Sequence, residues 1–393
     1  MPAELKSSWR RVLGRLSAAA SSTGEEEGGS PPSELLGGRY RILNEIGSGG
    51  MGTVYRALDR STGRVVTLKR LRAGAPSAGR GTSVSEARLE LAREFSLLAS
   101  LRHPNIISVL DYGFDGHGMP FFTMDLEENA LNIIDAGRGR TMSVQIDLVV
   151  QALRALAYLH RHGILHRDLK PDNVVVVGAQ VKVLDFGLST YLEAIEPPGT
   201  AWVGTLPYMA PEMLRGQQIT IATDLYALGM VAYELLVGEY PFDLRDRGAL
   251  ETHILKTSLP RAGDELDDRL RPVLARLLAK GPKDRFASAD ETVHALAAAL
   301  GQPFTVETVA TRESFLQAAP FVGRRDEIAR LMDVVRDAEQ GSGGAWLVAG
   351  ESGVGKSRLL DEIRTRALVR GVTVLRGRRA PRAVRRITSG ARW

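Results

Sequence analysis

The chain has no cysteine, no long hydrophobic run and no apolar N-terminal stretch. Zero cysteines in 393 residues exclude disulfide bonds and thiolate zinc sites. No apolar run approaches the roughly 18 residues of a membrane helix, and a secretory signal needs an apolar core that the N-terminus lacks. We therefore expect no membrane span and a cytoplasmic location. The 44% hydrophobic and 25% charged residues are typical of a globular protein with a sizeable core.

The basic pI near 9.5 comes from one end of the chain. Residues 363–393 contain ten arginines and no acidic residue. Subtracting these ten charges from the net +5 leaves −5 for residues 1–362. The main body is mildly acidic, so overall charge gives no reason to expect nucleic-acid binding.

A chain of this length predicts two or three domains. Residues 1–38 are rich in Ser, Gly, Glu and Pro after an initial LKSSWRRVLGRL, which predicts a flexible segment. The alternative is that the first part forms a short basic amphipathic helix against a membrane or partner.

The chain is organised around residues 166–187, HRDLKPDNVVVVGAQVKVLDFG. The β-branched runs VVVV and VKVL, separated by the turn-forming pair Gly-Ala, predict a β-hairpin. Asp168 and Asn173 precede this hairpin and Asp185 follows it, so the three side chains could converge. An aspartate that accepts a hydroxyl proton, beside oxygen ligands suited to Mg²⁺, is what phosphoryl transfer from a nucleotide requires.

Residues 40–71 alternate apolar and polar positions around two glycine-rich turns, which predicts three antiparallel strands. The first turn places Gly47, Gly49 and Gly52 in G-x-G-x-x-G spacing. Dinucleotide-binding folds share this spacing, but they continue into a helix, whereas residues 54–58 here continue as a strand. Glycines let a backbone close over phosphates without a Cβ in the way.

Together, the glycine-rich loop, HRDLKPDN and DFG resemble the motifs of the protein-kinase family over about residues 40–300. The resemblance implies an α+β, two-lobed fold with a β-rich N-lobe and an α-rich C-lobe, with ATP and Mg²⁺ as cofactors. HRDLKPDN and GTLPYMAPE resemble serine/threonine kinases, which implies protein substrates with Ser or Thr acceptors. Autophosphorylation between two copies would require a dimer.

The resemblance also implies the roles of the catalytic residues. Asp168 orients the substrate hydroxyl and takes up its proton. Lys170 neutralises the γ-phosphate, and Asn173 and Asp185 hold the metal. Phe186 is expected to pack under the helix that carries Glu94.

Lys69 matches the strand lysine that grips the α- and β-phosphates. It follows the last loop glycine by 17 residues and ends an apolar run. Its glutamate partner is assigned to Glu94 by distance from the HPN turn, with Glu90 one helical turn earlier as the competing assignment. Thr67 departs from the family, which usually has alanine in the adenine roof at this place.

Residues 120–127 predict a strand leading into the hinge, with Met124 as gatekeeper and residues 125–127 as the segment whose backbone bonds adenine. The implied nucleotide-contacting residues are Gly47, Ser48, Gly49, Gly50, Gly52, Val54, Lys69, Met124 and Asp125.

Regulation is implied by Arg167, which precedes the catalytic aspartate as in kinases switched by activation-loop phosphorylation. We predict autophosphorylation of Thr200 or Thr190, with Ser189 as a further acceptor. The alternative is that Arg167 only holds the loop's backbone. Thr205 is expected to hydrogen-bond Asp168 and Lys170.

Two structural roles follow from the same resemblance. Asp224 is expected to anchor the backbone of the catalytic loop, and Arg285 to pair with Glu212 of the APE motif.

A second motif follows the kinase-like region. GESGVGKS, residues 350–357, fits the P-loop pattern G-x-x-x-x-G-K-[ST], with an expected strand at 345–349 before it and a helix after it. The implied phosphate-binding residues are Gly350, Gly355, Lys356 and Ser357. The segment resembles the AAA-like ATPase module behind some bacterial serine/threonine kinases.

We expect a flexible segment at 1–38, a kinase domain at 39–300, a linker at 301–319, a partial P-loop segment at 320–375 and a basic tail at 376–393. Only 36 residues follow Ser357, and no Walker B strand is evident. A P-loop domain normally needs more residues, so we predict an incomplete segment that does not hydrolyse ATP by itself. Two interpretations of the final residues stay open: a disordered basic tail, or the product of a truncated or frame-shifted gene.

The favoured function is an active kinase, because none of Lys69, Asp168, Asn173 and Asp185 is missing. Two alternatives stay open. A nucleotide-binding scaffold would fit if the chain proved inactive, and a signalling ATPase with the kinase as its regulatory module would need a working second domain.

Overall fold

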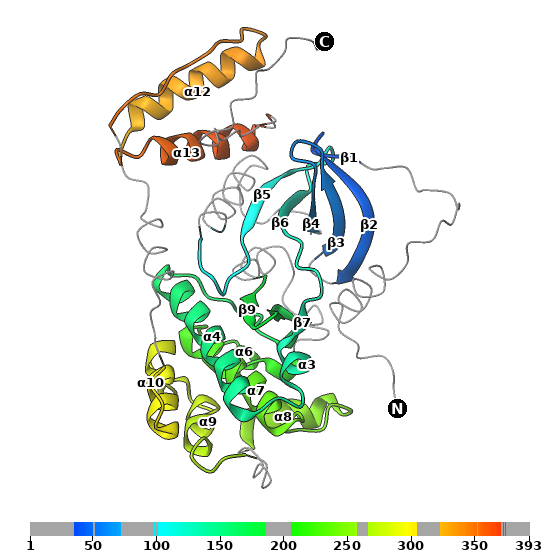
Figure 1. Ribbon diagram of the computed structural model, residues 1–393, viewed down its shortest axis with the longest axis vertical. Coiled ribbons are helices and arrows are strands. Elements are labelled where there is room, and N and C mark those ends of the chain that lie inside the picture. Colours follow the sequence, from blue (N-terminus) through cyan, green and yellow to red (C-terminus); the bar gives the residue numbers. More distant parts are fainter. Residues whose placement is uncertain are drawn as a thin grey trace, which may run out of the picture.

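The computed structural model describes residues 35–49, 52–71, 98, 101–185, 206–257, 266–304, 323–351, 353–370, 372 and 374. Figure 1 shows a sheet-rich lobe above a helical lobe, with α12 and α13 beside the sheet at the end remote from the helical lobe. The predicted two-lobed α+β architecture is therefore confirmed.

The N-lobe is a six-stranded sheet in the order β1-β2-β3-β4-β6-β5, with every neighbouring pair antiparallel. Its strands are β1 (Leu35–Leu36), β2 (Tyr40–Gly49), β3 (Gly52–Asp59), β4 (Arg64–Leu71), β5 (Val109–Phe114) and β6 (Pro120–Asp125). The three strands expected over residues 40–71 are β2, β3 and β4. Alternating buried positions along β3 place one face of the sheet on an apolar core, as the period of a strand requires.

The predicted hairpin after the catalytic loop is formed by β8 (Val174–Val177) and β9 (Gln180–Val183). Gly178 lies in the turn with φ +63°, a conformation that glycine adopts without steric cost. Strand β7 (Leu131–Asn132) pairs with β8 to complete a second, three-stranded sheet. Both ends of the hairpin are thereby fixed, which sets the positions of Asn173 and Asp185.

The C-lobe is helical and has α4 and α7 at its centre. Its helices are α3 (Ile133–Gly137), α4 (Met142–Arg161), α6 (Pro211–Leu214), α7 (Ile221–Val237), α8 (Arg247–Lys256), α9 (Arg271–Leu277) and α10 (Ala289–Leu300), with 3₁₀ turns at Pro171–Asn173, Leu206–Tyr208 and Pro282–Asp284. Apolar side chains at helical spacing on α4, among them Leu148, Ala152, Leu156 and Leu159, are buried.

Among the described residues, α4 is the one helix long and apolar enough to cross a membrane by length and composition. It packs against α7, α10 and β9 inside the C-lobe. The core helix of a globular domain meets the same test, and this burial accounts for the composition of α4.

The C-terminal segment contains α12 (Arg325–Glu339) and α13 (Lys356–Val369), which pack against each other. The helix expected after the P-loop motif is confirmed as α13. The strand expected at 345–349 is wrong: these residues form no strand, and Leu347 is 90% exposed. A parallel strand needs a neighbour for its backbone groups, and the described part of this segment supplies none.

Candidate active site

The backbone of the HRD loop is held in place by Asp224 in the first turn of α7. Its two carboxylate oxygens accept the backbone N–H groups of His166 and Arg167, both at 2.9 Å. Burial disfavours charge on Asp224, but the hydrogen bond from His160 Nε2 at 2.8 Å and the nearby His166 hold the pKa of this carboxyl below its usual value. The predicted anchoring role of Asp224 is confirmed.

Sequence reasoning missed His160 and His166 as supports of this loop. Burial lowers the pKa of the fully buried His166, so its imidazole is neutral at pH 7. Its Nε2 lies 2.9 Å from the carbonyl oxygen of Leu184, which can only accept, so Nε2 carries the proton. His166 thus ties the catalytic loop to the residue before Asp185. The only available signal was its place at the head of the HRD motif.

Two site residues have left-handed backbones. Arg167 has φ +65° and Asp185 has φ +57°, a region that non-glycine residues rarely occupy. Such conformations cost about 1–3 kcal/mol each and persist only where the surrounding structure fixes them. Here the Asp224 bonds and the β8–β9 hairpin supply that constraint.

Asp168, Lys170 and Asn173 form one hydrogen-bonded group. Lys170 Nζ lies 2.8 Å from Asp168 Oδ2, so the lysine and the aspartate face each other. Asn173 Nδ2 donates to the backbone oxygen of Asp168 at 2.7 Å and to Asp168 Oδ2 at 3.1 Å. The donor end of the amide is therefore occupied by the loop, and its oxygen end is left for another partner.

Lys69 and Asp185 form a buried ion pair between the lobes. Lys69 Nζ lies 2.7 Å from Asp185 Oδ2, and each side chain is 4% exposed. The pair joins β4 of the N-lobe to the segment just after β9. Glu94, the partner that the sequence assigns to Lys69, lies outside the described residues, so the Lys69–Glu94 pairing stays a prediction.

Three buried oxygens at this site have no hydrogen-bond partner among the described residues: Asp168 Oδ1, Asn173 Oδ1 and Asp185 Oδ1. Buried polar atoms are nearly always paired, so three orphans in one place call for a ligand. All are hard oxygen donors, two from carboxylates and one from an amide. Amide and carboxylate oxygens such as Asn173 Oδ1 and Asp185 Oδ1 are donors that Mg²⁺ takes alongside water and substrate phosphates, so these two residues fit the metal that the motif implies.

The glycine-rich hairpin is built from the ends of β2 and β3. Gly47, Ser48 and Gly49 lie on β2, and Gly52 opens β3. Gly52 has φ +141°, and a Cβ there would lie 2.2 Å from the carbonyl oxygen of Arg70. Only glycine fits this position, because β4 passes directly behind it.

A small apolar cluster lies between this hairpin and the hinge. Ile46 and Val54 are buried and Leu126 packs against them. Met124 and Thr67 are paired across β6 and β4, and both are buried. The predicted gatekeeper, hinge and roof residues therefore surround one region beside Lys69, which pairs with Val54 across β3 and β4.

Some predicted residues fall outside the described part of the chain. They are Gly50, Glu90, Glu94, Phe186, Ser189, Thr190, Thr200 and Thr205.

The buried core of the C-lobe contains a bidentate ion pair. Arg285 donates to both carboxylate oxygens of Glu212 at 2.7 and 2.8 Å, and both side chains are fully buried. Thr223 Oγ1 donates to the same carboxylate at 2.8 Å. Burial disfavours charge on Glu212, but the Arg285 bonds hold its pKa below the usual value. The predicted pairing is confirmed.

In the P-loop segment, Lys356 lies at the start of α13 and its Nζ folds back over the loop. It donates to the backbone oxygens of Gly350 at 2.8 Å and Glu351 at 2.6 Å. Gly353 and Gly355 have φ +86° and +89°, which explains glycine at both places. Ser357 is exposed on the first turn of the helix.

The fold and site are those of a protein kinase, and comparison with known families agrees. The family described as protein kinase domain matches residues 40–296, and the one described as AAA ATPase domain matches residues 320–390. The chain belongs to the protein kinase family, and the segment behind its kinase domain is similar to an AAA ATPase domain.

Similar proteins are bacterial serine/threonine kinases. A probable serine/threonine-protein kinase of Streptomyces coelicolor is 35% identical, covering 68% of this chain and 41% of the relative. The serine/threonine-protein kinase pkn3 of Myxococcus xanthus is 36% identical, covering 64% of this chain and 48% of the relative. The chain thus spans less than half the length of these two relatives.

A solved structure gives the same family. The crystal structure of the Mycobacterium tuberculosis PknI kinase domain has a TM-score of 0.50 and 27% identity, covering 69% of this chain and all of that one.

Proposed function

We propose that this chain is a serine/threonine protein kinase that transfers the γ-phosphate of Mg·ATP to protein hydroxyl groups. One observation carries the proposal: Asp168, Asn173 and Asp185 each leave a buried oxygen without a hydrogen-bond partner in the described part of the chain, at the site where the motifs converge. Burying such atoms without partners is costly, so their grouping supports a site that binds Mg·ATP.

Phosphoryl transfer needs alignment, charge neutralisation and a proton acceptor. Asp168 is held by Asn173 and Lys170 through Oδ2 and its backbone oxygen, so Oδ1 is the atom that accepts the proton of the attacking hydroxyl. Lys170 Nζ, 2.8 Å from Asp168, is placed to neutralise the transferring phosphoryl group. The oxygens of Asn173 and Asp185 would hold Mg²⁺, which supplies charge neutralisation on the β- and γ-phosphates.

The nucleotide would lie between the glycine-rich hairpin and the hinge. Ile46, Val54 and Leu126 supply apolar contacts for the adenine ring, and the backbone of residues 125–127 supplies its hydrogen bonds. Lys69 would contact the α- and β-phosphates while it stays close to Asp185. The side chain of Thr67, buried beside Met124, narrows the roof of this pocket compared with alanine.

The substrate class rests on Lys170 and on the relatives. HRDLKPDN places a lysine two residues after the catalytic aspartate, and the similar bacterial proteins are named serine/threonine-protein kinases. The same proposal includes a kinase domain bounded by residues 39–300 and a cytoplasmic signalling role. It also includes a dimer for autophosphorylation, and regulation by phosphorylation of Thr200, Thr190 or Ser189.

The test is autophosphorylation with Mg·ATP, comparing the natural chain with Asp168→Asn and mapping phosphosites by mass spectrometry. Phosphate on Thr200, Thr190 or Ser189 in the natural chain alone would establish an active kinase regulated through its loop. Nucleotide binding without any phosphate transfer, in the presence of a generic Ser/Thr peptide, would favour a scaffold.

A further inference from the structure

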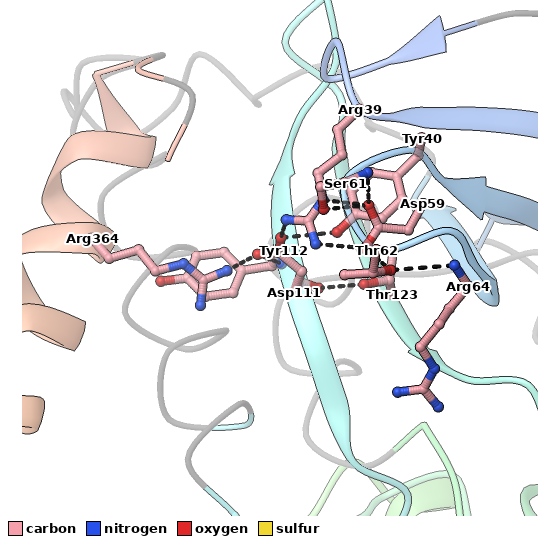
Figure 2. Close-up of polar contacts among 10 residues, drawn as sticks. All are labelled: Arg39, Tyr40, Asp59, Ser61, Thr62, Arg64, Asp111, Tyr112, Thr123 and Arg364. Atoms are coloured by element: carbon pink, nitrogen blue, oxygen red, sulfur yellow. Dashed lines mark hydrogen bonds and ion pairs between the residues drawn. The ribbon is translucent and has the colours of Figure 1, made fainter. Parts of the chain in front are cut away.

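Helix α13 of the C-terminal segment contacts strand β5 of the kinase N-lobe, as Figure 2 shows. Arg364 on α13 donates from Nη2 to Asp111 Oδ1 on β5. Its guanidinium also lies 5.6 Å from the centroid of the Tyr112 ring, within the range of a cation–π contact. The side chains of Arg364 and Asp111 are 16% and 10% exposed, so both are largely withdrawn from water.

Asp111 is held by the N-lobe through both oxygens, and Oδ1 also accepts the backbone N–H group of Tyr112 at 2.9 Å. Asp111 Oδ2 accepts from Arg39 Nη1 at 2.5 Å and from Tyr40 Oη at 2.9 Å. Arg39 precedes β2 and also donates to both oxygens of Asp59 at the end of β3, at 2.7 and 2.6 Å (Figure 2). One arginine therefore links the start of β2, the end of β3 and Asp111 on β5. The N-lobe therefore presents Asp111 in a fixed position with Oδ1 directed toward α13.

The charges of this network balance only when Arg364 is included. Asp59 and Asp111 contribute two negative charges, and Arg39 contributes one positive charge. Arg364 adds the second positive charge. An uncompensated charge that is mostly withdrawn from water is destabilising, so the Asp111 face favours a cation at this point.

The same helix carries the P-loop residues. Lys356 and Ser357 open α13, and Arg364 follows Lys356 by eight residues, about 12 Å along a helix. On the kinase side, Val109 of β5 pairs with Met124 of β6, next to the hinge. One rigid helix and one strand pair thus connect the phosphate-binding loop of the second segment to the nucleotide pocket of the first.

We propose that the Asp111–Tyr112 face of the N-lobe is the docking site for helix α13 of this same chain, with Arg364 as its anchor. Arg364 supplies the charge that the network lacks and covers the Tyr112 ring. Docking fixes the P-loop segment on the kinase N-lobe. A ligand that displaces α13 therefore also removes the contact that α13 makes with β5.

The test compares Arg364→Ala with Arg366→Ala in the full chain. Arg366 is the matched control because it lies on the same helix and pairs with Glu362 of that helix at 2.8 Å. Hydrogen–deuterium exchange followed by mass spectrometry would report on peptides from α13 and β5. We expect exchange in α13 to accelerate about tenfold in Arg364→Ala, as loss of a charge-assisted contact implies, and to stay unchanged in Arg366→Ala.

A second variant, Asp111→Asn, removes the charge from the other side while keeping a side chain of the same shape. It should accelerate exchange in α13 as Arg364→Ala does. The double variant Asp111→Asn/Arg364→Ala should accelerate exchange no further, because both substitutions remove the same interaction. Equal exchange in Arg364→Ala and the natural chain would overturn the proposal. So would a dimer in light scattering that Arg364→Ala dissociates, because the anchor would then act between two copies.

Discussion

Asp224 Oδ1 accepts the backbone N–H group of Arg167 at 2.9 Å, one residue before Asp168, the proposed catalytic aspartate. Arg167 has a left-handed backbone, so this bond holds a conformation that the chain would not adopt unaided. The position of Asp168 is consequently determined by α7 of the C-lobe and not by the loop alone.

Asp168→Asn should reduce phosphoryl transfer by about 10²–10⁴-fold, because an amide cannot take up the hydroxyl proton. Its shape preserves the bonds from Asn173 and Lys170, so nucleotide affinity should change little. Radiolabelled phosphate transfer and nucleotide binding would be measured on the same preparations. Asp290→Asn, which removes an exposed pair with Arg161, is the control. A fully active Asp168→Asn variant would contradict the assigned role.

Asn173→Ala should raise the Mg²⁺ concentration needed for half-maximal activity. Loss of a residue that only supports a metal ligand costs roughly 10–100-fold in metal affinity, and loss of a ligand should cost at least as much. The substitution removes one of the three orphaned oxygens and also the bond to the Asp168 backbone. A Mg²⁺ titration at saturating ATP measures the shift. The exposed Asn44→Ala serves as the control, and an unchanged Mg²⁺ requirement would exclude Asn173 as a ligand.

Lys69→Met and Asp185→Asn should each destabilise the chain strongly, by about 3–5 kcal/mol for Lys69→Met, which leaves a buried carboxylate unpaired. The double variant should be less destabilised than the sum of the two, since neither charge then remains. Urea unfolding of all four proteins closes this cycle. Strict additivity would show that the 2.7 Å contact contributes no coupling in solution.

The Glu212–Arg285 pair should make stability fall in acid. The pKa of Glu212 is lower in the folded state than its usual 4.5, so its stabilising contribution is complete above about pH 4.5 and is lost as pH falls through the folded pKa. Unfolding free energies between pH 7 and 3 should fall less steeply in the double variant Glu212→Gln/Arg285→Leu than in the natural chain. Identical slopes would contradict this. Arg285→Leu alone should cost about 3–5 kcal/mol at pH 7.

Lys356→Ala should leave ATP consumption unchanged when it is added to the Asp168→Asn variant, compared with Asp168→Asn alone. With the kinase site disabled, remaining hydrolysis would have to come from the P-loop, where Lys356 is engaged with the backbone oxygens of Gly350 and Glu351. Phosphate release at the level of buffer is the expected result. Hydrolysis that disappears on Lys356→Ala would instead support a signalling ATPase.

Local patterns in the sequence determined much of this protein. The hairpin after HRDLKPDN, the strands around the glycine-rich turn and helix α13 were predictable because alternation, helical periodicity and turn residues are properties of neighbouring positions. The spacing of Asp168, Asn173 and Asp185 indicated their convergence for the same reason, since a hairpin returns the chain to its starting point.

Only the tertiary structure decided which distant groups meet. The Lys69–Asp185 pair spans 116 residues and the Arg364–Asp111 pair spans 253. No local pattern in Arg364 or His160 distinguishes it from a solvated side chain. The strand expected at 345–349 is absent for the complementary reason: its apolar sequence favours a strand, but a strand forms only where neighbours bond its backbone. Sequence determines what each segment favours, and long-range contacts determine which preference is realised.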